Sequence, residues 1–396
     1  ALVDSAQVEV DFLAEHAAEV SDEVSLSSYE ELVRACQAEN NLLQKLSEFG
    51  SLDYDLDRAA DRLICITTLI RNFSFFEPNF TILGQPEVVQ LFTRVIQYMG
   101  TKDTLLRTSK NTLDFTKDIV IYLSNLSSSL QLPTKHDTLC LMHFLTSFAP
   151  QPAPTLSSEG LSFATYSPAI HKYLPPAVDS LTKLLARDEP NRGFFKSTFG
   201  SDRTHELLTK AFALTISAIP HSMHTSSAQL RAQIEARKPF LLQGLLAAEA
   251  LASFVPGPEQ NVARSWLQSQ DFWAGNLLKI AGIVSALPAP KNAQRNAGRD
   301  SRGQPQPQDD DPLAHNSLAN RAMALLRLLV AKSRITSATA SDADMSEEQI
   351  EDTLGNGIPS SVVLKRETFL MTMLSKDMDA SVLQGFCSYA ALEDGS

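Results

Sequence analysis

Residues 57–73, DRAADRLICITTLIRNF, form the stretch that decides the fold class. Apolar side chains recur along it at helical spacing, and they fall on nearly every side of the predicted helix. A helix without a wide polar face has to be covered by neighbours on several sides, which is typical of the inner helix in a stacked helical array. The stretch therefore predicts an all-α fold of stacked helices.

The end of this helix has a counterpart further along the chain. LIRNFS at 69–74 and YLSNLS at 122–127 share the pattern apolar, any, any, Asn, apolar, Ser. ALASF at 250–254 and LLRLL at 325–329 end similar apolar helices without the Asn. The spacing between these copies is irregular, so the sequence predicts degenerate helical repeats separated by insertions.

The chain divides into four predicted segments. Residues 1–27 form an acidic, weakly patterned leader with a short helix or partial disorder, and residues 28–287 carry helical repeats that begin at a capping box, Ser28 and Glu31. Residues 288–312 are rich in Pro, Gln, Asn, Arg and Asp, which predicts disorder. Residues 313–396 hold further helical repeats around a polar loop at 335–357. Helices after the first long one are predicted at 87–99, 115–130, 137–148, 175–187, 204–219, 239–254, 317–331, 361–374 and 382–392, and one or two more are predicted within 261–284.

Composition excludes several classes of protein. The formal net charge is −12, which argues against general attraction to nucleic acid or to an acidic membrane surface. No apolar run reaches the length of a membrane span. The four cysteines are far apart and form no CxxC pair, which is typical of a reduced intracellular protein. The first residue is Ala1, which indicates a piece of a longer chain.

The helix-end pattern resembles the third helix of armadillo repeats. The longer stretch LIRNFSFFEPN at 69–79 is similar to the start of the C-terminal conserved region of one SWI/SNF subunit, the one that carries an AT-rich interaction domain. Further stretches keep that family's order: VDSLTKLLARDEPN at 178–191, QGLLAAEALASF at 243–254, NLLKI at 276–280, NRAMALLRLL at 320–329, and 369–392. This resemblance covers most of 57–392 and implies an armadillo-like helical repeat solenoid.

The resemblance also implies a function. It indicates a scaffold in a nuclear chromatin remodeller that binds the ATPase and core subunits of that complex. The sequence contains no recognisable AT-rich interaction domain, so direct DNA binding is not implied. Three alternatives stay open: an unrelated armadillo or HEAT adaptor in cytoplasmic transport or signalling, an enzyme of a helical class, and DNA binding by the array itself.

No motif predicts catalysis, a cofactor or a metal. The chain lacks a phosphate-binding Gly-rich loop, GxSxG and HExxH. Three sets of residues have the composition of a cation site: His136 with His143, His221 with His224, and Asp53, Asp55, Asp57 and Asp61. The histidines favour core or solvated positions, since no third ligand is near. The aspartates favour the role of negative charge at the positive end of a helix dipole.

Candidate partner-binding residues lie at the two helix ends that share the Asn motif. Arg71, Asn72 and Asn125 are the polar candidates. An Asn at the end of an inner helix can bind the backbone of an extended partner, or it can bond to the local backbone instead. The phenylalanines beside this motif are expected in the core, with one or two left for a partner: Phe73, Phe75, Phe76 and Phe80.

The second half of the chain offers four more candidates. Trp266 and Trp273 lie seven residues apart and can share one helix face, where a core position is favoured and an interface is the alternative. Arg321 and Arg327 belong to a basic run with Lys332 and Arg334. That run can face DNA or an acidic partner helix, although a solvated face is the favoured interpretation.

Overall fold

The computed structural model of the protein describes residues 2–15, 26–42, 47–99, 106, 108–156, 160–220, 227–285, 312–333 and 380–394. Within these ranges every regular element is a helix, which confirms the predicted all-α helical array. The chain forms two compact units, which are described separately. Unit 1 comprises residues 1–155 and 166–217, and unit 2 comprises residues 156–165 and 218–396. Residues 288–311 of the predicted insertion at 288–312, the polar loop at 335–357 and the predicted helix at 361–374 lie outside the described residues, whereas Pro312 is the first residue of a helix.

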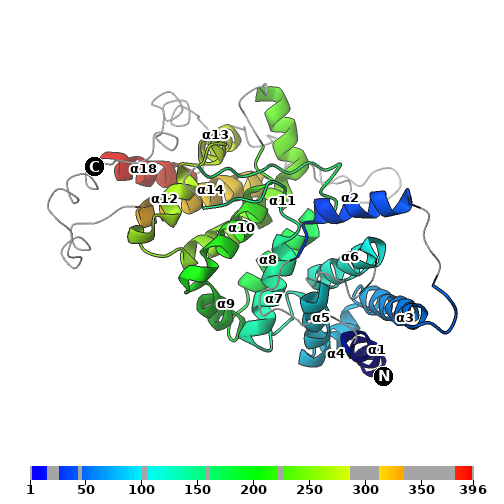
Figure 1. The fold of residues 1–396 in the computed structure, drawn as a ribbon. Coiled ribbons are helices and arrows are strands. Elements are labelled where there is room, and N and C mark those ends of the chain that lie inside the picture. Colours follow the sequence, from blue (N-terminus) through cyan, green and yellow to red (C-terminus); the bar gives the residue numbers. More distant parts are fainter. Residues whose placement is uncertain are drawn as a thin grey trace, which may run out of the picture. The chain divides into compact units, whose positions relative to one another are not determined.

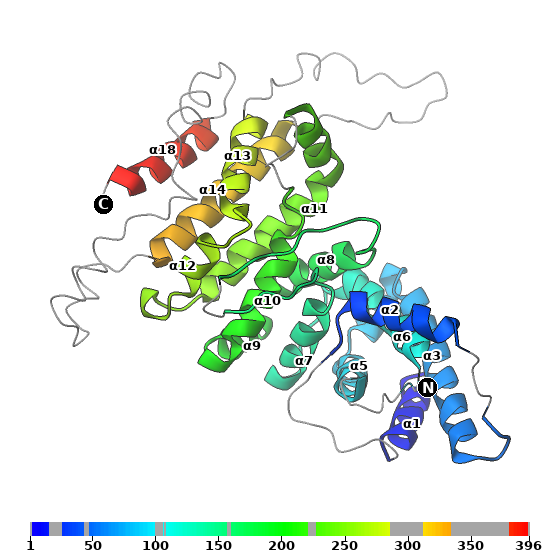
Figure 2. The same ribbon diagram turned by 45° about the horizontal axis from the view of Figure 1, so that its top comes forward.

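Unit 1 contains two rows of helices (Figures 1 and 2). One row consists of α3 (Leu52–Phe73), α6 (Ser109–Leu126) and α8 (Leu174–Leu185), and each helix packs on the next. The other row consists of α1 (Leu2–Glu15), α5 (Pro86–Met99), α7 (Lys135–Thr146) and α10 (His205–Ile216), which also pack in chain order. The remaining elements are α2 (Tyr29–Asn40), η1 (Glu77–Asn79), α4 (Phe80–Leu83), α9 (Asn191–Phe199) and η2 (Asp202–Thr204). This arrangement is that of stacked helical repeats, in which each repeat buries its apolar face on its neighbour.

Local capping explains where these helices begin. The predicted capping box is present at α2, where the Glu31 N–H donates to Ser28 Oγ (3.2 Å) and the Ser28 N–H donates to Glu31 Oε2 (2.9 Å). Thr108 and Thr134 cap α6 and α7 in the same position. The helix predicted to begin at Asp57 begins at Leu52, after the cap residue Ser51.

Aromatic rings fill the space between the two rows of unit 1. The Phe92 ring on α5 lies 4.7 Å from the Tyr122 ring and 6.1 Å from the Phe115 ring, both on α6. The Tyr122 hydroxyl donates to the Leu83 carbonyl (2.7 Å), which satisfies the phenol in the core. Burial raises the pKa of Tyr122 well above its ordinary value.

Unit 2 is organised around α14 (Pro312–Ser333), which packs on every other α-helix described in that unit. Those helices are α11 (Ser227–Phe254), α12 (Val262–Leu267), α13 (Trp273–Ser285) and α18 (Ala380–Asp394), and η3 (Pro258–Gln260) joins α11 to α12. The sequence predicted that α11 starts at Pro239, but the helix continues through that proline from Ser227. Because proline has no backbone N–H, Pro239 lacks one intrahelical hydrogen bond, and tertiary packing outweighs this local cost.

Candidate protein-binding surface

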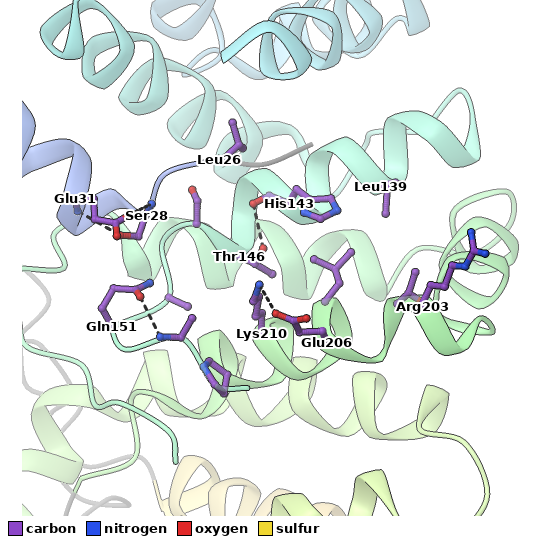
Figure 3. A pocket seen from close by; sticks show the side chains of 16 residues that line it. Leu26, Ser28, Glu31, Leu139, His143, Thr146, Gln151, Arg203, Glu206 and Lys210 are labelled. Atoms are coloured by element: carbon purple, nitrogen blue, oxygen red, sulfur yellow. Dashed lines mark hydrogen bonds and ion pairs between the residues drawn. The ribbon is translucent and has the colours of Figure 1, made fainter. Parts of the chain in front are cut away.

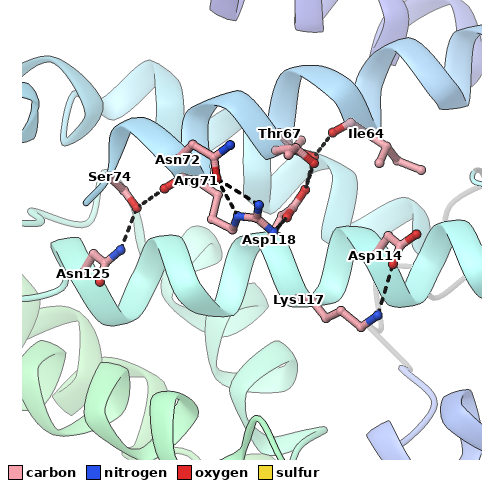
Figure 4. A network of polar contacts seen from close by, with 10 residues as sticks. Ile64, Thr67, Arg71, Asn72, Ser74, Asp114, Lys117, Asp118 and Asn125 are labelled. Carbon is pink, nitrogen blue, oxygen red and sulfur yellow. Dashed lines mark hydrogen bonds and ion pairs between the residues drawn. The ribbon is translucent and has the colours of Figure 1, made fainter. Parts of the chain in front are cut away.

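The seam between α3 and α6 carries a network of polar contacts (Figure 4). The Asp118 carboxylate on α6 accepts hydrogen bonds from the hydroxyls of Thr67 (3.1 Å) and Thr68 (2.7 Å) and pairs with Arg71 (2.7 Å), all on α3. Burial raises the pKa of Asp118, and these three partners oppose the shift. A buried carboxylate with three partners on the neighbouring helix fixes how the two helices are aligned.

The two copies of the Asn motif meet at the same seam. Asn125 Nδ2 on α6 donates to Ser74 Oγ at the end of α3 (2.8 Å), and the Ser74 hydroxyl donates to the Arg71 carbonyl (2.6 Å). Asn72 Oδ1 accepts from the Arg71 guanidinium (2.9 Å from Nη2). The structure therefore brings the candidates Arg71, Asn72 and Asn125 together. Arg71 and Asn125 each bond across the seam within the protein, whereas Asn72 is exposed.

The seam between α6 and α8 has the same kind of contact. Ser124 Oγ on α6 donates to Asp179 on α8 (2.7 Å), and Lys183 Nζ donates both to Asp179 (2.6 Å) and to the Ser124 carbonyl (2.6 Å). In the row of α3, α6 and α8, each helix after α3 thus bonds through an aspartate to the helix before it. Neither Asp118 nor Asp179 was predicted to make a contact between helices, because the pairing depends on which helices lie side by side.

The outer side of α3 is apolar and exposed, which corrects two expectations. The sequence predicted that this helix is covered on several sides, but only five of its 22 residues are buried. Phe73, Phe75 and Phe76 were expected mainly in the core, and they are exposed by 43%, 63% and 63%; Leu69 (40%) on the same helix is exposed as well. A side of the helix that would be covered inside the array therefore faces outward here.

Helix α2 lies across α6 and is held at both of its ends. At its start, Tyr29 stacks on Phe148 (5.6 Å between ring centroids), and its N–H donates to the Ser147 carbonyl (2.8 Å). Near its end, the Glu39 carboxylate accepts from the backbone N–H groups of Ser109 (2.8 Å) and Lys110 (3.3 Å), which are the first residues of α6. A carboxylate at a helix N-terminus is a favourable interaction with the unpaired N–H groups there.

A hydrogen-bonded contact that the sequence did not indicate fixes the start of α2. Glu30 Oε1 accepts from the Gln151 N–H (2.9 Å) and lies 2.8 Å from His171 Nε2. The Ser167 N–H donates to His171 Nδ1 (2.8 Å), so Nε2 carries the proton that is donated to Glu30. Burial alone raises the pKa of Glu30, but the hydrogen bonds from His171 and Gln151 outweigh it and leave that pKa lowered.

A pocket of about 590 Å³ opens between the start of α2, α7, the 149–154 segment and the start of α10 (Figure 3). Its charged lining includes Glu31, Glu206 and Lys210, and the last two form an ion pair (2.9 Å). Glu31 bonds to Ser28 in the capping box. These charged groups already have partners in the protein, and their arrangement does not indicate a nucleophile beside a base.

Trp266 and Trp273 belong to the core of unit 2. Their exposed fractions are 0% and 3%, and Trp273 Nε1 donates to the Trp266 carbonyl (2.8 Å). The Phe163 ring meets Trp273 edge-on at 6.3 Å. The core position that the sequence favoured is the observed one, and the buried rings offer no face to a partner. The two indoles therefore do not contribute to the candidate binding surface.

The basic run of α14 serves largely to pack that helix on α11. Arg321 pairs with Glu249 (2.8 Å), and Arg327 is half-buried. Lys332 Nζ donates to the carbonyls of Ser253 (2.8 Å) and Val255 (2.5 Å) at the end of α11, and burial lowers the pKa of Lys332. Arg334 lies outside the described residues.

The residues considered for cation binding do not assemble into a site. Asp57 accepts from Ser47, and Asp61 pairs with Arg58. Asp53 and Asp55 lie in the first turn of α3, where the helix dipole favours negative charge. Among the residues that the structure describes, no group of three His, Cys, Asp or Glu side chains could hold a metal ion. His136 contacts Gln97, and His221 and His224 lie outside the described residues.

No described helix combines the length and the apolar character needed to cross a membrane. No family model matches the chain. The sequence is, however, similar to two named proteins. The sequence is 30% identical over 280 residues to the SWI/SNF chromatin-remodeling complex subunit sol1 of Schizosaccharomyces pombe, a match that covers 66% of this chain. It is 31% identical over 144 residues to the SWI/SNF chromatin-remodeling complex subunit SWI1 of Saccharomyces cerevisiae, which covers 35% of this chain.

The chain is homologous to these SWI/SNF subunits over its core. The resemblance seen in the ordered motifs is thereby confirmed. The matched regions are only a part of each relative, 31% of sol1 and 11% of SWI1. What those proteins do as a whole therefore comes to this chain only as a proposal.

Proposed function

We propose that this chain is a non-catalytic scaffold region of a SWI/SNF-type chromatin-remodelling complex. Its helical array binds other protein subunits of the complex, including the ATPase and core subunits, in the nucleus. The observation that carries the proposal is the homology to two SWI/SNF subunits, one of them over 280 residues. Direct contact with nucleic acid is not part of this role, since the net charge is −12.

The architecture of unit 1 supports a binding role. Stacked helical repeats present extended surfaces made by successive helices, and such surfaces hold segments of other proteins. In α3, α6 and α8 these surfaces are held in register by aspartate contacts at each seam. Glu31, Glu206 and Lys210, which line the pocket beside α2, bond to one another or to nearby backbone, which favours a structural role for these three groups over a catalytic one.

Affinity purification tests the proposal. The tagged chain is expressed in cells, recovered from nuclear extract at moderate salt, and analysed by mass spectrometry for bound proteins. We expect a remodeller ATPase and its core subunits among the recovered proteins. Residence of the tagged chain in the cytosol alone, or recovery of none of these subunits, contradicts the proposal.

A matched pair of variants asks whether the array itself is needed. Asp118→Ala removes the buried carboxylate of the α3–α6 seam, and Asp114→Ala removes a more exposed carboxylate one helical turn away. We expect Asp118→Ala to reduce recovery of the bound subunits and Asp114→Ala to leave it unchanged. Equal recovery with both variants contradicts a role that depends on the intact array.

A further inference from the structure

An exposed apolar stripe runs along the outer side of α3. Cys65, Leu69 and Phe73 follow one another at intervals of four residues, so they share one face of the helix, and all three are exposed. The turn after the helix adds Phe75 and Phe76, both 63% exposed. The turn itself is ordered, since Asn79 Nδ2 donates to the Phe73 carbonyl (3.0 Å). We call the set Leu69, Phe73, Phe75 and Phe76 the outer α3 face.

The outer α3 face points away from α6, the helix of the same row that packs on α3. Thr67, which bonds to Asp118 of α6, lies two residues from both Cys65 and Leu69. At about 100° per residue, two residues correspond to about 200° around the helix. Helix α6, the next helix of the same row, packs on both α3 and α8. Within this row, a helix is therefore the element that covers a side of the kind that α3 leaves exposed.

Helices α1 and α3, which pack on each other, and the segment from α3 to the end of α5 carry a net negative charge. Residues 2–15 and 52–99 contain ten aspartates and glutamates, four arginines and no lysine. Each of the four arginines already pairs with a carboxylate: Arg58 with Asp61, Arg62 with Glu9, Arg71 with Asp118 and Arg94 with Asp11. A partner with basic side chains is attracted to this region, whereas a partner with acidic side chains is repelled.

We propose that the outer α3 face binds an amphipathic α-helix of another subunit, whose apolar stripe is flanked by lysines or arginines. The apolar stripe of the partner covers Leu69, Phe73 and Phe76, and its basic flanks face the carboxylates of α1 and α3. This inference rests on the proposed function, because it names the surface and the partner chemistry of that binding role. A second copy of this chain fits less well, since two acidic surfaces would face each other.

Site-specific crosslinking in the full chain tests the proposal. A photocrosslinking phenylalanine analogue replaces Phe76, the complex is purified from nuclear extract, and crosslinked peptides are identified by mass spectrometry. We expect peptides from another subunit with apolar residues at helical spacing and flanking lysines or arginines. The same analogue at Ile170, which is also exposed in unit 1, is the matched control and is expected not to yield these peptides.

A defined probe tests the chemistry directly. A helical peptide of leucine and lysine in an amphipathic pattern is titrated into the purified full chain, and a peptide with glutamate in place of lysine serves as the comparison. We expect the lysine peptide to bind and the glutamate peptide not to bind. We expect the variant Leu69→Ser/Phe73→Ser/Phe76→Ser to weaken binding of the lysine peptide on the order of tenfold or more, and Ile170→Ser to leave that affinity unchanged.

The outcomes separate this inference from the proposed function. Remodeller subunits can be recovered without crosslinks at position 76, or with crosslinks only to this chain, to a second copy or to acidic segments. Each of these results overturns the inference and leaves the proposed function standing. Recovery of no remodeller subunit, with the lysine peptide still bound at the outer α3 face, contradicts the proposed function and leaves the surface chemistry standing. Equal binding of both peptides overturns the assignment of a basic partner.

Discussion

Helices α3 and α6 end in the same sequence pattern but differ in how they are buried. Helix α3 buries five of 22 residues, and α6 buries ten of 18. Phe73 in the first copy is 43% exposed, whereas its counterpart Leu126 in the second copy is fully buried. Of these two helices, only α6 has a described helix of the same row on both sides, because α8 packs on it as well as α3.

The local role of the motif is the same in both copies. Ser74 and Ser127 each follow the last helical residue and are fully buried, and each hydroxyl donates to a carbonyl of the preceding turn (2.6 Å in both cases). The serine therefore ends the helix wherever the motif occurs. The position of the helix in the array decides which of the other motif residues are buried.

The largest expected effect is at the seam that joins the two helices. Asp118→Ala leaves Arg71, Thr67 and Thr68 without their common acceptor, and breaking a buried pair in this way destabilises by about 3–5 kcal/mol. Asp114→Ala removes a partly exposed ion pair with Lys117 on the same helix and should cost less than about 1 kcal/mol. Denaturant unfolding of the two variants measures both values. A loss at Asp118 no larger than that at Asp114 contradicts the structural role of the seam.

The counterpart positions of the motif provide a second test. Leu126→Ala opens a cavity in the core and should cost about 2–5 kcal/mol. Phe73→Ala removes a larger side chain, but one that is already 43% exposed, so we expect about 1 kcal/mol or less. The measurement is the unfolding free energy of each variant under the same conditions. If Phe73→Ala is as costly as Leu126→Ala, the outer α3 face is covered in the isolated protein.

These helices also show what the sequence could predict. Periodicity, the capping box at Ser28 and the repeated Asn motif predicted the helices, their all-α class and a repeat relation between α3 and α6. Asn125 bonds to Ser74, so the two motif copies are neighbours in space. Helical spacing and caps are local signals, and local signals were sufficient for these features.

Burial and pairing could not be predicted in the same way. An apolar helix was expected to be covered on several sides, but coverage depends on which helices stack against it, as the exposed Phe73 shows. The contact of Glu30 with His171 joins residues 141 positions apart, and no periodic signal spans that distance. Pro239 marked a helix start by local rules, whereas tertiary packing continues α11 through it.

Substitution of the asparagines in the two copies of the motif should change the unfolding free energy by smaller amounts. Asn125→Ala removes a hydrogen bond between helices and leaves Ser74 Oγ without that donor, so we expect a loss of about 1 kcal/mol. Asn72→Ala affects an exposed side chain that bonds to the adjacent Arg71, and the expected change is within about 0.5 kcal/mol. A double-mutant cycle of Asn125→Ala with Ser74→Ala isolates the coupling energy. A coupling energy of zero contradicts a contribution of this bond to the seam.

The expected effect at α2 is also small; this helix covers part of α6 but does not pack to a comparable extent on α3. The pKa of Glu30 is lowered in the folded protein, so its stabilising contribution is fully present above the ordinary glutamate pKa and is lost as the pH falls through the lowered value. Between about pH 7 and about pH 4 we expect the amides of α2 to lose at most about 1 kcal/mol of protection, while those of α3 keep theirs. Hydrogen exchange, corrected for the intrinsic pH dependence, measures this difference. Glu30→Gln cannot ionise and should abolish the pH dependence at α2, so a pH dependence that persists in this variant assigns the effect to another group.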